Sequence, residues 1–447
     1  MSGRPASRLP LLDTEVFLER EQHKSHLAFT FEVEPGTAYL CLHFDYQPAR
    51  VGSLRNLLTL SLSDPERPRG SLHRHHSGNP QVSWIGPTAS PGWMPGTLPP
   101  GRWTLWIDAH AVLEPAKVQV RVDAEERAGQ EPPPVAGRPQ SELGARKLWK
   151  PAGWWVGELH CHSNHSDGQW TPEQIAASAA QEGLDFVALT DHNTKSGGSA
   201  WPAWGPLRLS GLELTTFYGH ALVLGETWPD WREGIPFAQL SEAAEQQGDL
   251  VVMAHPAAEG DPVCTGCRWV HPDCLPGPLK LIEVWNGPWS DRNEQALQLW
   301  HRWLDQGFAL AITAGSDAHS ASTWRSGQIG RTVIASPSLE PSALLRSLKR
   351  GQAYLSCGPH LSAAVREGGA GTADLEVTVQ GEKGEDSWML RLVQSKGEQS
   401  REAPIGSSRQ RIERRWGEWV TIELRGPHGV LALSNAIWPW GSPLRSS

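Results

Sequence analysis

The chain has 447 residues, of which 39% are hydrophobic and 20% are charged, and its formal net charge is −9. This length exceeds one ordinary hydrophobic core and predicts two or three domains. The acidic balance excludes the broad basic surface that binding to a nucleic-acid polymer requires. No apolar run suits a membrane span, and the first arginines lack the apolar core of a signal peptide. A cytoplasmic protein is therefore expected, and its six cysteines do not suggest a disulfide framework.

Residues 1–130 are expected to form a β-sandwich domain. Short runs of alternating apolar and polar residues recur there, separated by glycine and proline turns, as in known sandwiches. These runs lie at residues 29–33, 39–44, 57–62, 103–107 and 118–122. No catalytic cluster stands out, and the basic run that begins at His73 is interpreted as an exposed loop. The predicted role of the domain is packing, or a wall for a site formed elsewhere.

The rest of the chain divides into three parts by pattern. Residues 131–147 are rich in proline and glycine and predict a linker. From 148 to 362 strands alternate with helices, which is typical of an α/β fold. One helix is expected from its cap Thr171 to Gly183. Residues 363–447 return to short strands and predict a small C-terminal β domain.

Several apolar strands in the α/β region end directly before acidic or imidazole side chains. Those side chains are Asp191, His192, His255, Asp317 and His319. In βα barrels the active site is built from the C-terminal ends of the strands. We therefore expect residues scattered along the chain to converge at one mouth.

A second signal is the segment from Glu158 to Gly168, which contains His160, His162 and Asp167. Side chains alternate on an extended segment, so His160 and His162 point to the same face. Asp167 precedes a glycine where the chain bends, so its carboxylate can return toward the pair. Imidazole and carboxylate together suit zinc, manganese or iron better than calcium or magnesium. The segment therefore predicts half of a metal site.

Together these pieces resemble the PHP (polymerase and histidinol phosphatase) metallohydrolases, over about residues 153–360. With its flanking β regions the chain is also similar to the CehA/McbA branch of that family. The resemblance rests on the motifs at residues 158–162, 166–168, 190–193, 211–213, 254–256 and 315–319. It implies an α/β fold of a particular kind, a distorted (β/α)7 PHP barrel that holds two or three divalent metals.

The resemblance also implies a ligand set. The metal ligands would be His160, His162, Asp317 and Glu213 at the first metal, Glu213, His220 and His255 at the second, and Asp167, His192 and His319 at the third. Glu213 would bridge two metals, because a carboxylate has two oxygens. A water between the two cations would ionise near neutral pH and become the nucleophile. Catalytic roles are expected for Asp191, Glu213 and His255, with Asp191 orienting an imidazole or moving a proton.

Three residues are expected to contact substrate: Glu283, Asn286 and Arg325. Glu283 and Asn286 lie at a strand end that points to the same mouth, although a structural role explains them equally well. A guanidinium binds phosphate bidentately, so Arg325 is a candidate together with Arg268 and Arg331. The alternative for each arginine is an ordinary place on the surface.

A separate cluster contains Cys264, Cys267, His271 and Cys274. These residue types can bind a structural zinc, although the spacing is not one of the common zinc-finger spacings. Free thiols or a disulfide are the alternatives.

The leading hypothesis is a metal-dependent hydrolase that uses a metal-bridging hydroxide, most simply a phosphoesterase for a small molecule or nucleotide. The first alternative is a carboxyl or carbamate ester hydrolase for aryl substrates, which abundant tryptophans could bind. The second is a non-catalytic metal-binding scaffold. No polymeric nucleic acid and no membrane is expected as a partner, and the oligomeric state stays open.

Overall fold

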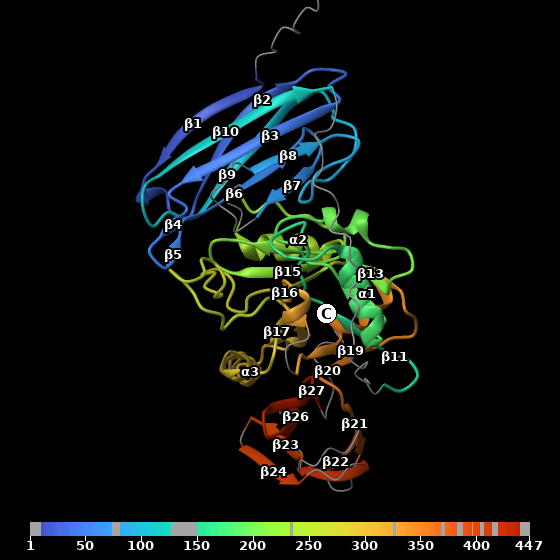
Figure 1. Ribbon diagram of the computed structural model, residues 1–447. Coiled ribbons are helices and arrows are strands. Elements are labelled where there is room, and N and C mark those ends of the chain that lie inside the picture. The colour runs from blue at the N-terminus through green and yellow to red at the C-terminus, as the bar shows by residue number, and fades with distance from the viewer. Residues whose placement is uncertain are drawn as a thin grey trace, which may run out of the picture.

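The structure is a computed structural model of the chain (Figure 1). It describes residues 10–73, 81–126, 150–232, 236–324, 328–367, 372–381, 388–395, 397–402, 406–413 and 419–438. The predicted linker at 131–147 lies outside these ranges. Every helix within them is too short or too polar to cross a membrane.

Two antiparallel four-stranded sheets form the N-terminal region, in the orders β1-β10-β3-β8 and β2-β9-β6-β7. Inward residues such as Leu42, Leu60 and Leu105 are fully buried in one core that the two sheets share. The strands predicted from alternation are therefore present, and they pack as a sandwich. The strands are β1 (Leu12–Leu18), β2 (Ser25–Val33), β3 (Tyr39–Gln47), β6 (Leu57–Ser63), β7 (Pro68–Leu72), β8 (Gln81–Ile85), β9 (Gly101–Ala111) and β10 (Ala116–Glu125), with the short pair β4 (Arg50–Val51) and β5 (Leu54–Arg55).

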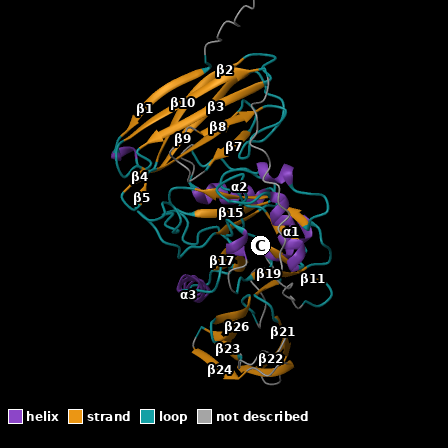
Figure 2. Cartoon of the chain, viewed as in Figure 1, coloured by secondary structure: helices purple, strands orange, loops and turns teal. Residues whose placement is uncertain are grey.

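Strands and helices alternate after residue 150, and most of the helices of the molecule lie in this middle region (Figure 2). The strands are β11 (Trp154–Glu158), β12 (Phe186–Ala188), β13 (Leu207–Leu209), β14 (Gly211–Thr215), β15 (His220–Leu224), β16 (Leu250–Met253), β17 (Leu281–Asn286), β18 (Ala311–Gly315), β19 (Arg331–Ala335) and β20 (Ala353–Ser356). The helices are α1 (Pro172–Glu182), α2 (Phe237–Gln246), α3 (Asp291–Asp305), α4 (Ala321–Trp324) and α5 (Pro341–Lys349), with the 3-10 turn η2 (Ser196–Ala200). A second 3-10 turn, η1 (Arg20–Gln22), lies in the N-terminal region between β1 and β2.

Helix α1 begins and ends at the residues that the sequence indicates. The Thr171 hydroxyl accepts a hydrogen bond from the Gln174 backbone N–H at 3.2 Å, and the Gln174 side chain accepts one from the Thr171 N–H at 2.9 Å. This reciprocal pair is a capping box. Gly183 ends the helix at φ +79°, a left-handed conformation that glycine adopts without a steric penalty.

The strands of the middle region belong to two sheets. Strands β14 to β18 form a five-stranded sheet, whereas β11, β12 and β13 lie in a nine-stranded sheet with the order β13-β12-β11-β19-β20-β27-β26-β23-β24. Single bridges, Cys161 to Ala318 and His192 to Glu213, connect the two sheets. The fold is thus mixed α/β as predicted, but the described residues contain no closed sheet, and the seven-stranded barrel stays a prediction.

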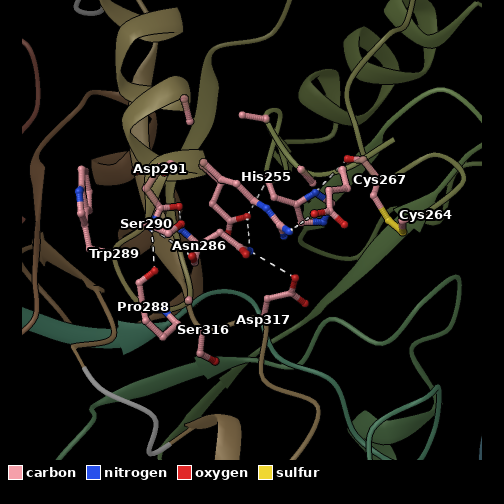
Figure 3. A pocket seen from close by; sticks show the side chains of 18 of the residues that line it. His255, Cys264, Cys267, Asn286, Pro288, Trp289, Ser290, Asp291, Ser316 and Asp317 are labelled. Atoms are coloured by element: carbon pink, nitrogen blue, oxygen red, sulfur yellow. Dashed lines mark hydrogen bonds and ion pairs between the residues drawn. A yellow bond between two sulfur atoms is a disulfide. The ribbon is translucent and has the colours of Figure 1, made fainter. Parts of the chain in front are cut away.

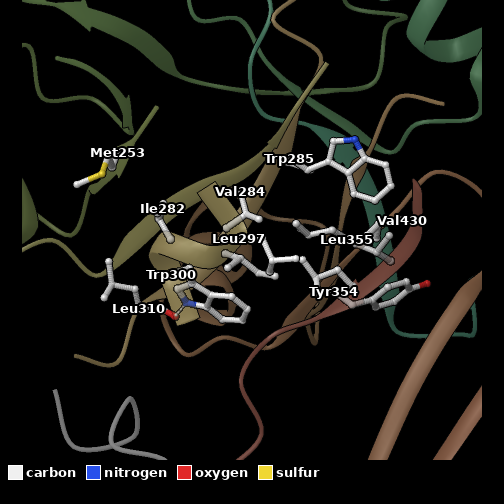
Figure 4. Close-up of a cluster of buried hydrophobic side chains, with 14 of the residues drawn as sticks. Met253, Ile282, Val284, Trp285, Leu297, Trp300, Leu310, Tyr354, Leu355 and Val430 are labelled. Atoms are coloured by element: carbon white, nitrogen blue, oxygen red, sulfur yellow. Dashed lines mark hydrogen bonds between the residues drawn. The ribbon is translucent and has the colours of Figure 1, made fainter. Parts of the chain in front are cut away.

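The C-terminal strands extend the nine-stranded sheet of the middle region through one pair of strands. β27 (Gly429–Ser434) pairs with β20, and β26 (Val420–Gly426), β23 (Met389–Gln394) and β24 (Gly397–Glu402) extend the same sheet. β21 (His360–Glu367), β22 (Thr372–Gln380) and β25 (Gly406–Glu413) form a separate three-stranded sheet. Apolar side chains from both regions, including Trp285, Leu297, Tyr354 and Val430, belong to one buried cluster (Figure 4).

Candidate metal centre

The predicted ligands converge in one place. Four groups of three or four side chains each present nitrogen or carboxylate oxygen atoms within 4.8 Å of one another. One group contains His162, Asp167, His192 and His319, and the others are His160, Glu213 and His255; His160, His162 and Asp317; and His192, Glu213 and His220. These groups include every metal ligand predicted from the sequence, although the ligands are spread along the chain from His160 to His319.

Strand ends bring these side chains together. His160 and His162 follow β11, His255 follows β16, and Asp317 follows β18. The backbone φ is +26° at His255 and +50° at Asp317, and it is +51° at Asn193, which is next to His192. Residues other than glycine adopt such angles at a cost, and this cost is concentrated at functional sites. The backbone at these strand ends is therefore held in place by its surroundings.

Glu213 lies at the centre of the cluster. Its Oε1 is 3.0 Å from His220 Nδ1 and 2.9 Å from His255 Nε2. Its Oε2 faces three further imidazole nitrogens, at 3.0 Å from His192, 3.3 Å from His162 and 3.4 Å from His160. Burial raises the pKa of the Glu213 carboxyl, but the surrounding imidazoles, His192 and His160 foremost, lower it well below its usual value. Glu213 is therefore ionised, with each oxygen directed at a different set of nitrogens.

Several buried atoms of the cluster have no hydrogen-bond partner among the described residues. They are Nε2 of His160, both ring nitrogens of His162, Nε2 of His220 and Oε2 of Glu213. A buried polar atom without a partner costs about 1–3 kcal/mol. A divalent cation would give these atoms a partner, and the mixture of imidazole and carboxylate suits zinc, manganese or iron. The residues therefore fit the metals that the resemblance implies.

His319 has the most exposed side chain of the cluster, at 35%, and it lies against the buried carboxylate of Asp167. Asp167 Oδ1 is 3.2 Å from His319 Nε2 and 3.6 Å from His192 Nε2. Burial lowers the pKa of His319, but Asp167 and Asp317 outweigh it and raise this pKa to about 10. At His160 burial also opposes the charge, and Glu283, Asp317 and Glu213 raise the pKa well above its usual value. Negative charge thus dominates the cluster, which favours cations.

Glu283 and Asn286, predicted at the substrate, contact the ligands. The Glu283 carboxylate lies 3.0 Å from His160 Nδ1 and accepts hydrogen bonds from the His255 N–H and the Asn286 amide, each at 3.0 Å. Glu283 is 1% exposed. A carboxylate that receives the second N–H of a ligating histidine fixes its ring and raises its basicity. The contacts therefore support a positioning role for Glu283, and a contact with substrate stays a prediction for both residues.

The variant Glu283→Gln should lower metal affinity by about 10–100-fold, because the amide keeps the shape but loses the charge that holds His160. Titration of the metal-free variant with Mn²⁺ or Zn²⁺ measures this change. Glu259→Gln is the control, since Glu259 pairs with Arg292 at a half-exposed position. Equal affinity in the two variants would contradict the positioning role.

Asp191, predicted to be catalytic, is buried and fixes a loop. Its Oδ1 accepts from the Ser163 N–H at 2.7 Å and from the Ser166 hydroxyl at 2.8 Å, and its Oδ2 accepts from the Ser163 hydroxyl at 2.8 Å. This loop connects His162 to Asp167, so Asp191 determines where both side chains lie. Its proposed part in proton transfer stays a prediction.

The three candidate arginines have different outcomes. Arg325 lies outside the described residues. Arg268 donates from Nε to the Ala258 carbonyl at 3.0 Å and is an exposed loop residue. Arg331 is fully buried, donates to Glu158 and Glu182, and packs 4.2 Å from the Trp324 ring. The prediction of Arg331 as a phosphate ligand or surface residue is therefore wrong, because two carboxylates occupy its guanidinium.

The variant Arg331→Met should destabilise the protein by about 3–5 kcal/mol, since it leaves Glu158 buried without its cation. Glu158 Oε1 accepts from the His160 and Ser316 N–H groups, so the change also loosens the backbone at the metal centre. Urea unfolding measures the loss. Arg102→Met, which removes the exposed pair with Glu32, should cost less than about 1 kcal/mol. If Arg331→Met lowered the free energy of unfolding by as little as Arg102→Met does, the structural role of the buried pair between Arg331 and Glu158 would be contradicted.

The predicted structural zinc site is not formed. Cys264 and Cys267 are joined by a disulfide, so neither can supply the thiolate that zinc requires. His271 Nε2 lies 2.9 Å from the Thr216 hydroxyl, and the buried Cys274 donates to the Pro276 carbonyl. Of the alternatives that the sequence leaves open, the disulfide is therefore the one present, and these four side chains do not form a zinc site. A disulfide is uncommon in a reducing compartment, and the cytoplasmic location stays a prediction.

A pocket of about 690 Å³ opens beside the metal centre (Figure 3). Asp317, His255 and Asn286 contribute to its wall, and the disulfide lies at one side. The first residues of α3 and Trp289 line the other side. Pockets of this size hold small molecules, nucleotides among them.

One protein family and two curated proteins match parts of this chain. The PHP domain family matches residues 158–254, which contain His160, His162, Asp167, His192, Glu213 and His220. A phosphoribosyl 1,2-cyclic phosphate 1,2-diphosphodiesterase of Eggerthella lenta is 44% identical over 45 residues, which are 10% of this chain and 17% of that enzyme. An uncharacterized protein of Methanocaldococcus jannaschii is 29% identical over 124 residues, which are 24% of this chain and 69% of the relative.

Solved structures give weaker likenesses. One is a two-domain protein of Bacteroides vulgatus that contains a predicted PHP-like metal-dependent phosphoesterase. It is 17% identical with a TM-score of 0.41, and the match covers 66% of this chain and 99% of that one. A proposed metal-dependent phosphoesterase of Bifidobacterium adolescentis is 20% identical with a TM-score of 0.28, covering 36% and 87% of the two chains.

The matched segment ends just before His255, and the remaining predicted ligands join the same cluster from outside it. Residues 158–254 of the chain are therefore similar to the PHP domain family.

Proposed function

We propose that this protein is a metal-dependent phosphoesterase that acts on a small molecule or nucleotide. The observation that carries the proposal is the convergence of all predicted ligands around Glu213, with buried nitrogen and oxygen atoms that have no hydrogen-bond partner in the described part of the chain. We also propose that β11 to β20 form the open counterpart of a PHP barrel, because single bridges connect the two sheets beside the cluster.

Bound divalent cations would polarise a phosphoryl oxygen and lower the pKa of water. The protein residues supply the rest. Glu213 presents one oxygen toward His220 and His255 and the other toward His160, His162 and His192, so it can bind two cations at once. Glu283 fixes the ring of His160, and Asp191 fixes the loop that leads to Asp167.

Substrate would enter through the pocket beside Asp317. The Asn286 side-chain NH2 lies in this wall and donates to Glu283 at 3.0 Å and to Asp317 Oδ2 at 3.4 Å, so its Oδ1 is the atom that could accept a hydrogen bond from the substrate. Among the described residues that line the pocket, Arg292 and His255 are the basic ones, and Arg292 pairs with Glu259. An anionic group distant from the reacting bond would compete with Glu259 for this guanidinium.

The proposal is tested with protein purified without chelator and loaded with Mn²⁺ or Zn²⁺. An aryl phosphate, a cyclic nucleotide and an aryl carbamate are offered side by side, because the CehA/McbA resemblance predicts carbamate or carboxyl ester hydrolysis instead. We expect phosphoester hydrolysis that is lost in His160→Ala. Hydrolysis of the carbamate alone supports the alternative, and equal background rates in wild type and His160→Ala would indicate a non-catalytic module.

A further inference from the structure

One face of the sandwich is polar in sequence yet buried in the structure. On β9, Leu105, Ile107 and Ala109 enter the sandwich core, so Asp108 and His110 point to the other face of the sheet. Asp108 and His110 are 0% exposed. On β6, Thr59 is opposite Asp108 and Ser61 is opposite Trp106, and they are 0% and 3% exposed. Polar side chains on the outer face of a sandwich are normally solvated, so another part of the chain must cover them.

The α/β region provides this cover, and a buried ion pair fixes it. Arg232 donates from Nε to Asp108 Oδ1 at 3.0 Å and from Nη2 to the Ser61 hydroxyl at 2.7 Å. Asp108 also accepts from the Ser61 hydroxyl at 2.5 Å, and its Oδ1 lies 2.8 Å from His26 Nδ1. A buried charge is tolerated only with its partners in place, so this network fixes the position of the sandwich relative to the α/β region.

A second contact joins the sandwich to the segment that carries His192. The Gly92 N–H donates to the Ser196 hydroxyl at 3.2 Å, and its carbonyl accepts from the Thr194 hydroxyl at 2.8 Å. Gly92 has φ +101°, and a Cβ there would lie 2.7 Å from the Ser71 carbonyl oxygen. This contact lies within the sandwich, and the same Cβ would also come within 3.3 Å of the His165 carbonyl oxygen across the interface, so both the backbone angle and the packing favour glycine here.

His73 extends the contact into the metal centre. It follows β7, is 3% exposed, and its ring centroid lies 4.4 Å from that of His192. His162 stacks on His192 at the same distance, and His110 lies 5.3 Å from His73. The interpretation of His73 as an exposed loop residue is therefore wrong, because the α/β region buries it. His192 is packed between an imidazole of its own region and one of the sandwich.

We infer that His73 is a positioning residue for His192, so that the sandwich completes the group formed by Asp167, His192 and His319. This inference rests on the metal centre of the proposed function. His192 Nδ1 lies 2.6 Å from the Thr215 hydroxyl, which fixes one edge of the ring. The packed ring of His73 fixes its tilt, and hence the direction in which Nε2 points toward Asp167. Without His73 the ring would keep its contacts with Thr215 and His162 but would lose the packing on its sandwich side that restricts its tilt.

The test is the number of tightly bound divalent metals per full-length chain, measured by mass spectrometry after gel filtration in metal-free buffer. We expect His73→Ala and His192→Ala each to lose one equivalent relative to wild type. His73→Phe keeps a packed ring and should retain it. His43→Ala is the control, since His43 lies on β3 with a side chain that is 42% exposed.

Each outcome decides the inference. Full metal content in His73→Ala overturns it, and so does loss of metal in His73→Phe, because the nitrogen itself would then be required. If His73→Ala does not fold, His73→Leu keeps the buried volume without the flat ring and should lose the same equivalent, whereas full content there also overturns the inference. Wild type without bound metal would overturn the proposed function as well, whereas wild type with metal but without hydrolysis leaves this test intact.

Discussion

Glu213→Gln should abolish most hydrolysis, with a fall in kcat of at least about a thousandfold. Glutamine keeps the shape of the side chain but loses the charge, and its amide nitrogen cannot bind a cation. Glu213 faces five imidazoles, so no neighbouring carboxylate can take over both of its contacts. The kcat of metal-loaded protein and the metal content are measured together.

Glu226→Gln is the matched control, because Glu226 is an exposed acid that follows β15. It should keep wild-type activity and metal. If Glu213→Gln retained activity within about tenfold of wild type, the bridging role of Glu213 would have to be abandoned.

Removal of metal should have the second large effect, on both activity and stability. The cluster buries Glu213 and Glu283 close to Asp317, and cations that bind only the folded state stabilise it. For metal at about a thousand times its dissociation constant the gain is about 4 kcal/mol, which corresponds to a melting-temperature shift on the order of 10 °C. Dialysis against a chelator followed by calorimetry measures this shift.

Re-addition of Mn²⁺ or Zn²⁺ should restore both activity and melting temperature, whereas Ca²⁺ should restore neither fully, because imidazole nitrogen is a poor ligand for calcium. A melting temperature that does not respond to any of these ions would show that the cluster is stable as a network of histidine–carboxylate pairs alone.

Local patterns in the sequence predict much of this structure. Alternation places five of the sandwich strands, β2, β3, β6, β9 and β10, but not β1, β7 or β8. A cap and a glycine bound α1, and the motifs identify every member of the candidate metal cluster. These signals are local because each depends on side chains within a few residues. The convergence of strand ends was expected because βα barrels form their active sites at the C-terminal ends of the strands, and no single residue predicts it.

What the sequence could not predict depends on contacts between distant segments. Arg331 is a surface arginine by composition, and only the positions of Glu158 and Glu182 explain its burial. The sheet continues from β20 to β27, across the predicted boundary at residue 362, because main-chain pairing carries little side-chain signal. Cys264 and Cys267 could equally form a disulfide or bind zinc until the positions of His271 and Cys274 are known.

His73 shows the same limit at the site itself. An imidazole in a basic, polar run has no apolar periodicity, and the sequence gives no sign that the sandwich presents it to His192. A polar residue on the outer face of a strand is read as solvated unless another region is known to cover it. Asp108 on β9 gives no hint either, because an acid at an outward position fits the alternation of a solvated face, and only the structure shows that it is buried.

The most direct test of the central claim is anomalous X-ray diffraction from crystals of the full chain grown with Mn²⁺ or Zn²⁺. The account predicts anomalous peaks inside the cluster, at about 2.0–2.3 Å from imidazole nitrogens and from an oxygen of Glu213. Peaks found only elsewhere, with none within bonding distance of His160, His162 or Glu213, would contradict it.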